Sequence, residues 1–161
     1  MSEFRIEKRK VPAELTLSTG AVVDGCLFLA GSNSARSGPE RVADLLNAEP
    51  GFFPFELANP GPDGLTTALY NRAHLVRVRL REDTDEVQLD SGYKTATKKH
   101  VTILLSSGET ITGSVRVYRP PGRDRLSDYT RSSEVFRYIE STDATYVVNG
   151  AFVVELRETT Q

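Results

Sequence analysis

The sequence has few of the residues that carry covalent catalysis, metal binding or disulfide formation. It contains one cysteine, Cys26, two histidines and no tryptophan. A single cysteine cannot form an internal disulfide, and no Cys-x-x-Cys or His-x-x-x-His spacing predicts a metal site. No apolar run approaches the length of a membrane-spanning helix, and the charged start MSEFRIEKRK lacks the apolar segment of a secretory signal. We therefore expect a cytoplasmic protein that needs no membrane, metal or cofactor.

The charges are close to balance, with 20 basic and 22 acidic side chains in 161 residues. Apolar residues make up 39% and charged residues 26% of the chain, as in soluble globular domains. Wholesale disorder is excluded by this composition. The near-neutral charge also argues against a broad basic surface for nucleic acid.

A pattern of glycines and apolar residues occurs twice along the chain. Gly20 and Gly25 interrupt the apolar residues of 15–29 as Gly108 and Gly113 interrupt those of 103–117. The later blocks 41–45, 53–55 and 70–76 match 125–129, 136–138 and 148–154 in the same order. The separation between matching residues shortens stepwise, which is expected if loops of a second copy lost residues. The sequence therefore predicts an internal duplication.

Each copy is predicted to form five short strands, because apolar and polar residues alternate within it. The predicted strands are 13–18, 21–30, 51–58, 65–71 and 74–80, then 100–106, 110–118, 134–140, 145–149 and 151–157. Residues 40–47 are predicted to form one short helix in the first copy. The expected fold is all-β, with two tandem five-stranded Sm-like or SH3-like small barrels at 1–80 and 100–161 and a linker at 81–99.

Glycines and one asparagine indicate the turns between these strands. Gly20 and Gly108 stand where tight hairpins are needed, because glycine accepts a positive φ without strain. Asn149-Gly150 is typical of a two-residue hairpin. Gly25 and Gly113 lie inside predicted strands, where they indicate a bulge or a sharp bend that lets the strand curl.

The run Leu15-x-Leu17-x-x-Gly20-x-x-Val23-x-Gly25-x-Leu27 resembles the first signature of the Sm-like fold. Residues 149–156, Asn-Gly-Ala-Phe-Val-Val-Glu-Leu, resemble its closing strand pair. A separate bacterial family of tandem barrels of this type is the alternative. The resemblance implies strand-edge assembly and RNA binding. The RNA-binding residues match poorly, since Asp44 is followed by Asn47 at a different spacing and the last hairpin of the second copy lacks the Arg.

Enzymatic and cyclic-dinucleotide functions have little support in the sequence. Cys26 lies in an apolar strand and is expected to be a buried small side chain, while His74 and His100 are expected at the surface. No nucleophile motif or phosphate-binding loop occurs. Arg5-x-x-x-Arg9 is similar to the arginine pair of PilZ domains, so a PilZ-like cyclic-dinucleotide binder is a weaker alternative, although the second motif of those domains is missing. We expect no enzyme; an active site between the barrels stays the weakest alternative.

The residues predicted to contact a partner are Phe52, Phe53, Phe55, Arg119, Arg123 and Arg125. The adjacent aromatics fall on opposite faces of a strand, so one must leave its own barrel and pack between the copies or on another protein. The arginines suit an acidic partner or nucleic acid, unless they pair locally with acidic neighbours. The leading prediction is a non-enzymatic adaptor that binds proteins through barrel edges and the loops 31–50 and 119–131. The alternative is an Sm-like RNA-binding protein, and a homo-oligomer stays open.

Overall fold

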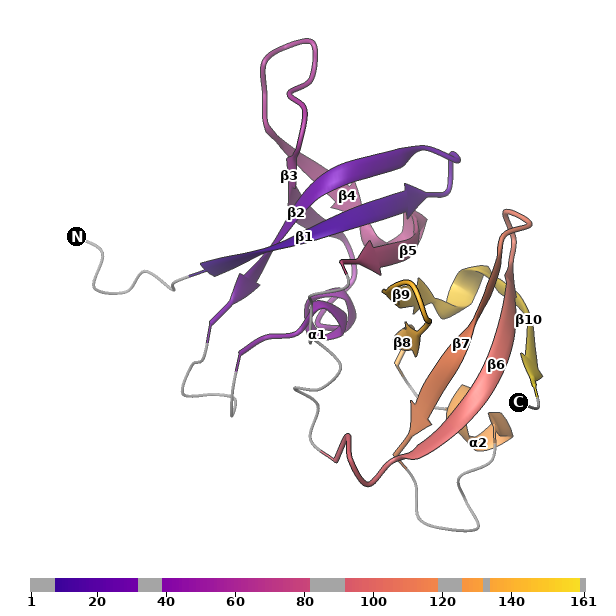
Figure 1. The fold of residues 1–161 in the computed structure, drawn as a ribbon. Coiled ribbons are helices and arrows are strands. Elements are labelled where there is room, and N and C mark those ends of the chain that lie inside the picture. Colours follow the sequence, from indigo (N-terminus) through magenta and orange to yellow (C-terminus); the bar gives the residue numbers. More distant parts are fainter. Residues whose placement is uncertain (1–7, 32–38, 82–91, 119–125, 132–133, 160–161) are drawn as a thin grey trace.

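The structure, a computed structural model, describes residues 8–31, 39–81, 92–118, 126–131 and 134–159 (Figure 1). The strands of this part form one antiparallel sheet in the order β10-β6-β7-β8-β9-β5-β1-β2-β3-β4. Their bounds are β1 Lys8–Leu17, β2 Val22–Ala30, β3 Phe52–Leu57, β4 Thr67–Asn71, β5 Leu75–Leu80, β6 Thr97–Leu105, β7 Thr110–Val117, β8 Phe136–Glu140, β9 Thr145–Asn149 and β10 Val153–Glu158. The all-β expectation is confirmed.

The predicted strands are all present, with changed ends. Strand β1 begins at Lys8 rather than at residue 13, and β6 begins at Thr97 rather than at residue 100. The last residues of the expected linker 81–99 are therefore strand, because they continue the pairing of β6 with β7 out to Val117. The predicted short helix is α1, Val42–Asn47, and a five-residue turn of helix, α2, spans Leu126–Thr130.

The first half (residues 8–80) and the second half (97–158) use the same order of neighbouring strands. That order is β5-β1-β2-β3-β4 in the first half and β10-β6-β7-β8-β9 in the second. The pairing register also shifts at corresponding places, between Thr16 and Leu17 against β5 and between Val153 and Glu155 against β6. A position in one half can therefore be matched to a position in the other by strand register.

The glycine turns follow the sequence prediction, whereas the internal glycines have another reason. Gly20 and Gly108 both have φ of 92° in the β1–β2 and β6–β7 hairpins. The β1–β2 pairing runs without a bulge across Gly25. A Cβ on Gly113 would lie 2.6 Å from the carbonyl oxygen of Glu140, and one on Gly25 would overlap the carbonyl of Glu56. Of the bulge or sharp bend expected at Gly25, the bulge does not occur, and close approach of the next strand explains the glycine.

The predicted Asn149-Gly150 hairpin is also wrong, because β9 and β10 are not neighbours in the sheet. Residues Gly150–Phe152 form a 3-10 turn, η3, in which the Asn149 side chain accepts a hydrogen bond of 2.9 Å from the N–H of Ala151. An asparagine side chain can replace a backbone partner in this way. The turn then sends β10 across to β6. At η1, Arg72–His74, the Asn71 side chain likewise accepts a hydrogen bond of 2.9 Å, from the N–H of Ala73.

The apolar core has two clusters, and each takes residues from both halves. The first contains most buried apolar residues of the first half together with Phe136 and Val147. The second contains those of the second half together with Val76 of β5. The halves are thus packed on each other at the centre of the sheet. The two outermost strands, β4 and β10, lie at its opposite ends.

Candidate functional site

The junction between the halves is a strand pairing, formed by β5 and β9 (Figure 1). Its antiparallel register runs from Arg77 opposite Val148 to Leu80 opposite Thr145. Backbone hydrogen bonds therefore join the two halves as they join neighbouring strands within each half. An edge strand of this fold is able to pair with a strand from outside its own half.

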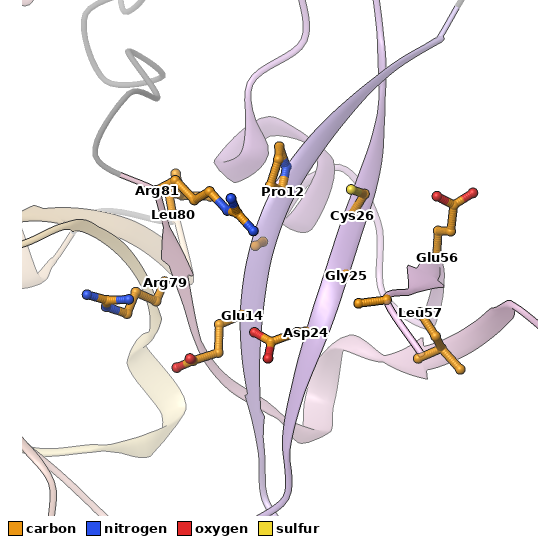
Figure 2. Close-up of a pocket in the computed structure, with 12 residues that line it drawn as sticks. Pro12, Glu14, Asp24, Gly25, Cys26, Glu56, Leu57, Arg79, Leu80 and Arg81 are labelled. Carbon is orange, nitrogen blue, oxygen red and sulfur yellow. The ribbon is translucent and has the colours of Figure 1, made fainter. Parts of the chain in front are cut away.

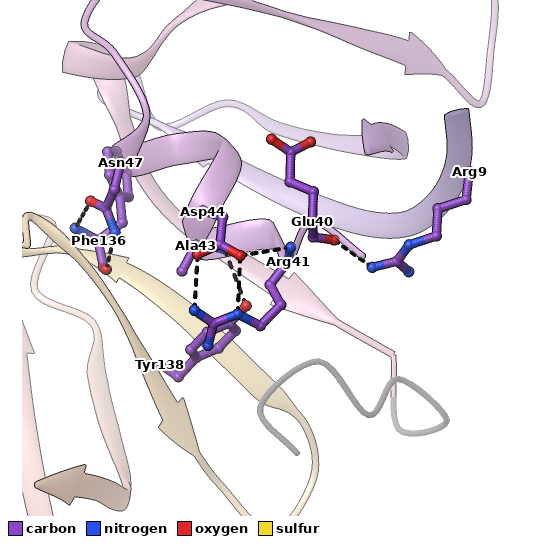
Figure 3. A network of polar contacts seen from close by, with 8 residues as sticks. All are labelled: Arg9, Glu40, Arg41, Ala43, Asp44, Asn47, Phe136 and Tyr138. Atoms are coloured by element: carbon purple, nitrogen blue, oxygen red, sulfur yellow. Dashed lines mark hydrogen bonds and ion pairs between the residues drawn. The ribbon is translucent and has the colours of Figure 1, made fainter. Parts of the chain in front are cut away.

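Helix α1 of the first half packs against β8 of the second half at this junction (Figure 3). The N–H of Ala43 donates to the Tyr138 hydroxyl at 3.1 Å. The Asn47 side chain donates to the Phe136 carbonyl oxygen and accepts from the Phe136 N–H, both at 2.9 Å. Phe136 is left only 4% exposed. The contact between halves thus combines a strand pair with a helix packed against the adjoining strand.

The six residues of α1 are too few to be stable alone, so their position depends on local contacts. The carboxylate of Asp44 accepts from the Arg41 N–H at 3.0 Å and pairs with the Arg41 guanidinium at 2.9 Å. Arg9 donates to the carbonyl oxygen of Glu40 at 2.7 Å just before the helix (Figure 3). These contacts hold the start of α1 in place.

Arg77 adds an electrostatic link between the halves. Its side chain is about nine-tenths buried, and its Nε donates to Oε1 of Glu109 in the second half at 2.6 Å. A terminal nitrogen lies 3.6 Å from the Glu14 carboxylate of the first half, and the guanidinium stands 5.1 Å from the Tyr146 ring centroid. One buried cation is thus shared by carboxylates from both halves.

Strand β4 is the last strand at one end of the sheet and carries large exposed apolar side chains. Leu69 of β4 is 66% exposed and Phe52 of the adjacent β3 is 60% exposed. Leu65, just before β4, is 62% exposed. A cluster of exposed apolar residues beside an open strand edge favours a contact with another chain.

The backbone groups of Leu69 point away from β3. The N–H of Leu57 bonds to the Thr66 carbonyl, and the N–H of Arg72 bonds to the Gly51 carbonyl. Hydrogen-bonded and non-bonded pairs alternate in an antiparallel ladder, so Leu69 opposite Pro54 is a non-bonded pair. The Leu69 N–H and carbonyl therefore face the open edge.

Strand β10 is the last strand at the other end of the sheet. The N–H of Thr159 bonds to the His100 carbonyl at 2.8 Å, and the same alternation places the backbone N–H and carbonyl of Leu156 on the open side. Val154 is 64% exposed. The charges of Glu155 and Arg157 are paired with each other at 2.7 Å.

The predicted contact residues fall into three groups. Phe53 and Phe55 are fully buried and pack on the Tyr70 ring, whereas Phe52 is exposed. Phe52 is thus the aromatic that leaves its own core, and it stays exposed rather than packing between the copies, where Phe136 of β8 packs instead. Arg119, Arg123 and Arg125 lie outside the described residues.

The comparison of the two halves in the sequence aligned the aromatics one position out of register. It matched Phe53 to Phe136. The strand pairing instead matches Phe52 to Phe136, since each lies opposite the asparagine that ends the following strand. Asn71 and Asn149 were matched in the sequence, but the loops before them differ in length, so only the strand pairing fixes which phenylalanines correspond.

An open cavity of about 420 Å³ is lined by residues inside β1 and β2 and by the C-terminal ends of β3 and β5 (Figure 2). Glu14 and Asp24 stand opposite each other on β1 and β2 at its wall. Cys26, expected to be buried, is half-buried at this cavity rather than in the core. No group of three metal-ligating side chains occurs among the described residues.

Each histidine contacts one serine through Nδ1. His74 lies 2.9 Å from the Ser18 hydroxyl at an exposed position, as expected for a surface histidine. His100 lies 3.0 Å from the Ser114 hydroxyl. His100 and Ser114 are direct partners in the β6–β7 register, so strand pairing alone brings them together.

A closed polar triad anchors the segment that precedes β6. The Arg116 Nε donates to the Glu140 carboxylate at 3.0 Å, and the Tyr93 hydroxyl donates to the same carboxylate at 2.9 Å. The Arg116 guanidinium also donates to the Tyr93 oxygen and lies 4.1 Å from the ring centroid. Burial and then the Glu140 carboxylate raise the pKa of Tyr93 above its usual value.

No helix among the described residues is long and apolar enough to span a membrane. We compared the chain with protein-family models, with curated proteins and with solved structures, and no match was found in any of the three.

Proposed function

We propose that this chain is a non-enzymatic protein-interaction module made of two Sm-like small barrels that arose by internal duplication. Its binding surfaces are the open edges of β4 and β10. The recurring strand order and the matching register shifts support the duplication. So do the two hairpin glycines with the same φ.

The observation that carries this proposal is the pairing of β5 with β9. In this pairing, the edge strand of one half forms backbone hydrogen bonds with the edge strand of the other half of the same chain. The edges of β4 and β10 offer the same kind of backbone groups to a partner, which would extend the sheet by one strand. Exposed Leu69 and Val154 add apolar area at the two edges.

The experiment uses the tagged full chain and two edge variants, Leu69→Pro and Leu156→Pro. Proline removes the outward N–H at each edge and spares the hydrogen bonds to β3 and β6. Val22→Lys is the control, because Val22 is 58% exposed but lies in β2, inside the sheet. Bound proteins are identified from a cell lysate, and hydrogen exchange is then measured on each purified complex.

The proposal expects proteins that bind the natural chain and the control but not the edge variant, with slowed exchange in β4 or β10. Equal recovery by all four chains would contradict it. Recovery of RNA in place of protein would replace it with the RNA-binding alternative, and changing Arg123 and Arg125 to Ala should then abolish a gel shift that weakens with salt.

A further inference from the structure

Phe52 occupies the strand position that Phe136 holds in the other half. Phe52 is opposite Asn71 and Phe136 is opposite Asn149 in the two ladders. Yet Phe52 is 60% exposed and Phe136 is 4% exposed. The difference has one visible cause, since Phe136 is covered by α1 of the neighbouring half and packs in that half's core cluster. Phe52 has the matching face and no such cover.

Two further pairs repeat this contrast. Leu69 and Val147 each stand two residues before the terminal asparagine of their strand; Leu69 is 66% exposed and Val147 is fully buried. Val154 and Val76 are each the second residue of their strand, and they are 64% and 2% exposed. Val147 and Val76 are buried at the junction between the halves. The exposed residues lie on both outer edges.

From these matches we infer that the open β4 edge binds the open β10 edge of a second copy of this chain, head to tail. The inference rests on the proposed interaction function and names its partner. Transferring the β5–β9 register gives four antiparallel pairs. They are Tyr70 with Glu155, Leu69 with Leu156, Ala68 with Arg157 and Thr67 with Glu158.

The backbone groups of the two edges fit this register. Leu69 and Leu156 both direct their N–H and carbonyl away from their own neighbours, as the ladder alternation shows. Their pairing would correspond to that of Val147 with Val78 at the internal junction. No strand needs to shift or flip for the second junction to form.

A helix follows the second strand of each half in chain order, α1 after β2 and α2 after β7. Helix α2 belongs to the half that supplies β10, as α1 belongs to the half that supplies β5. It would lie over the Phe52 face of the next molecule. One contact is not reproduced, because Glu155 stands where the internal junction has Arg77, so the buried Arg77–Glu109 pair has no counterpart. The contact between copies is therefore weaker than the internal junction and depends on concentration.

The geometry of this contact determines how an assembly of several copies grows. The two surfaces are different, and each molecule carries one of each. Such head-to-tail contacts close into a ring or extend as a filament. Blocking one surface per molecule must therefore stop growth, while two molecules blocked at opposite surfaces must still form one contact.

Sedimentation velocity of the full chain over a range of concentrations tests this inference. The natural chain and Val22→Lys are expected to form larger species as concentration rises. Leu69→Pro and Leu156→Pro are each expected to stay monomeric alone. Mixed together they should form a 1:1 dimer and nothing larger, because one intact β10 edge meets one intact β4 edge. Circular dichroism of each variant is the control that it is folded.

A natural chain that stays monomeric at the highest concentration overturns the inference, as does a mixture that yields no dimer. Loss of assembly in Val22→Lys would also count against it. The proposed function has a separate readout. A monomeric chain that still recovers a foreign protein through its edges refutes only the second copy as partner, whereas a monomeric chain with edge-independent recovery refutes both.

Discussion

The side chain of Asn47 pairs with the backbone of Phe136 through two hydrogen bonds, each 2.9 Å long. Helix α1 of the first half is thereby fixed against β8 of the second. Replacing Asn47 with Ala leaves the N–H and carbonyl of Phe136 without these partners in a partly buried place. We expect Asn47→Ala to lower the free energy of unfolding by about 1–3 kcal/mol. Urea denaturation measures it, with exposed Asn59→Ala as a control that should cost less than about 0.5 kcal/mol.

The adjacent phenylalanines of β3 should differ sharply in their effects on stability. Phe53 is fully buried, so Phe53→Ala is expected to cost about 3–5 kcal/mol through lost contacts and a cavity. Phe52 is 60% exposed, so Phe52→Ala should change the stability of the monomer by no more than about 0.5 kcal/mol. Both are compared in the Leu69→Pro background. Equal costs for the two would mean that the register of β3 is different.

The internal glycines should not tolerate even one added methyl group. A Cβ on Gly113 would lie 2.6 Å from the Glu140 carbonyl, a backbone atom that cannot rotate away. We expect Gly113→Ala to cost about 1–3 kcal/mol, and Gly25→Ala, where the overlap is greater, to cost at least as much. The control is Gly61→Ala, since the nearest atom there belongs to the movable Asp63 side chain. Thermal unfolding of the three variants tests the order.

The two ion pairs that involve Glu109 and Glu155 should differ in value because their burial differs. The Arg77 side chain is 10% exposed and depends on Glu109, so Glu109→Gln is expected to cost about 1–2 kcal/mol. The Arg157–Glu155 pair is 70% and 45% exposed, so Glu155→Gln should cost less than about 0.5 kcal/mol. Denaturant unfolding of the two variants measures the difference. A larger loss for Glu155→Gln would contradict the described junction.

Tyr93 should make stability fall in alkaline solution. Burial and Glu140 raise the pKa of Tyr93 in the folded state, so folding favours the protonated phenol. This contribution is present below the unfolded pKa near 10 and is lost as pH rises through the folded pKa. Tyr129, also with a raised pKa, acts in the same direction. Tyr93→Phe should reduce, but not abolish, the alkaline fall measured by urea denaturation at several pH values.

Strand positions could be predicted because they depend on local pattern. Alternation in Val101, Ile103 and Leu105 places them on one face, and all three are buried. Gly20 and Gly108 mark their hairpins because positive φ is a local requirement. The misread turn at Asn149-Gly150 shows the limit of such rules, since that dipeptide fits a hairpin equally well until the Asn149 side chain is seen to bond the Ala151 N–H.

The junction and the open edges could not be predicted from local pattern, because which strand lies beside which is a long-range property. Val76 and Val154 occupy the same place in similar strands, each after an apolar residue and before a charged one, Arg77 or Glu155. One is buried by β9 and its half, and the other ends the sheet. The proposed binding surface consists of the positions at the two ends of the sheet that lack a neighbouring strand, whereas their counterparts at the junction have one.

The sharing of core residues across the junction has a consequence for how the protein melts. Phe136 and Val147 complete the first cluster, and Val76 completes the second. If either half unfolded alone, the other half would lose part of its core and would expose apolar side chains to water. Heat should therefore melt the chain in a single cooperative step, with calorimetric and van't Hoff enthalpies that agree.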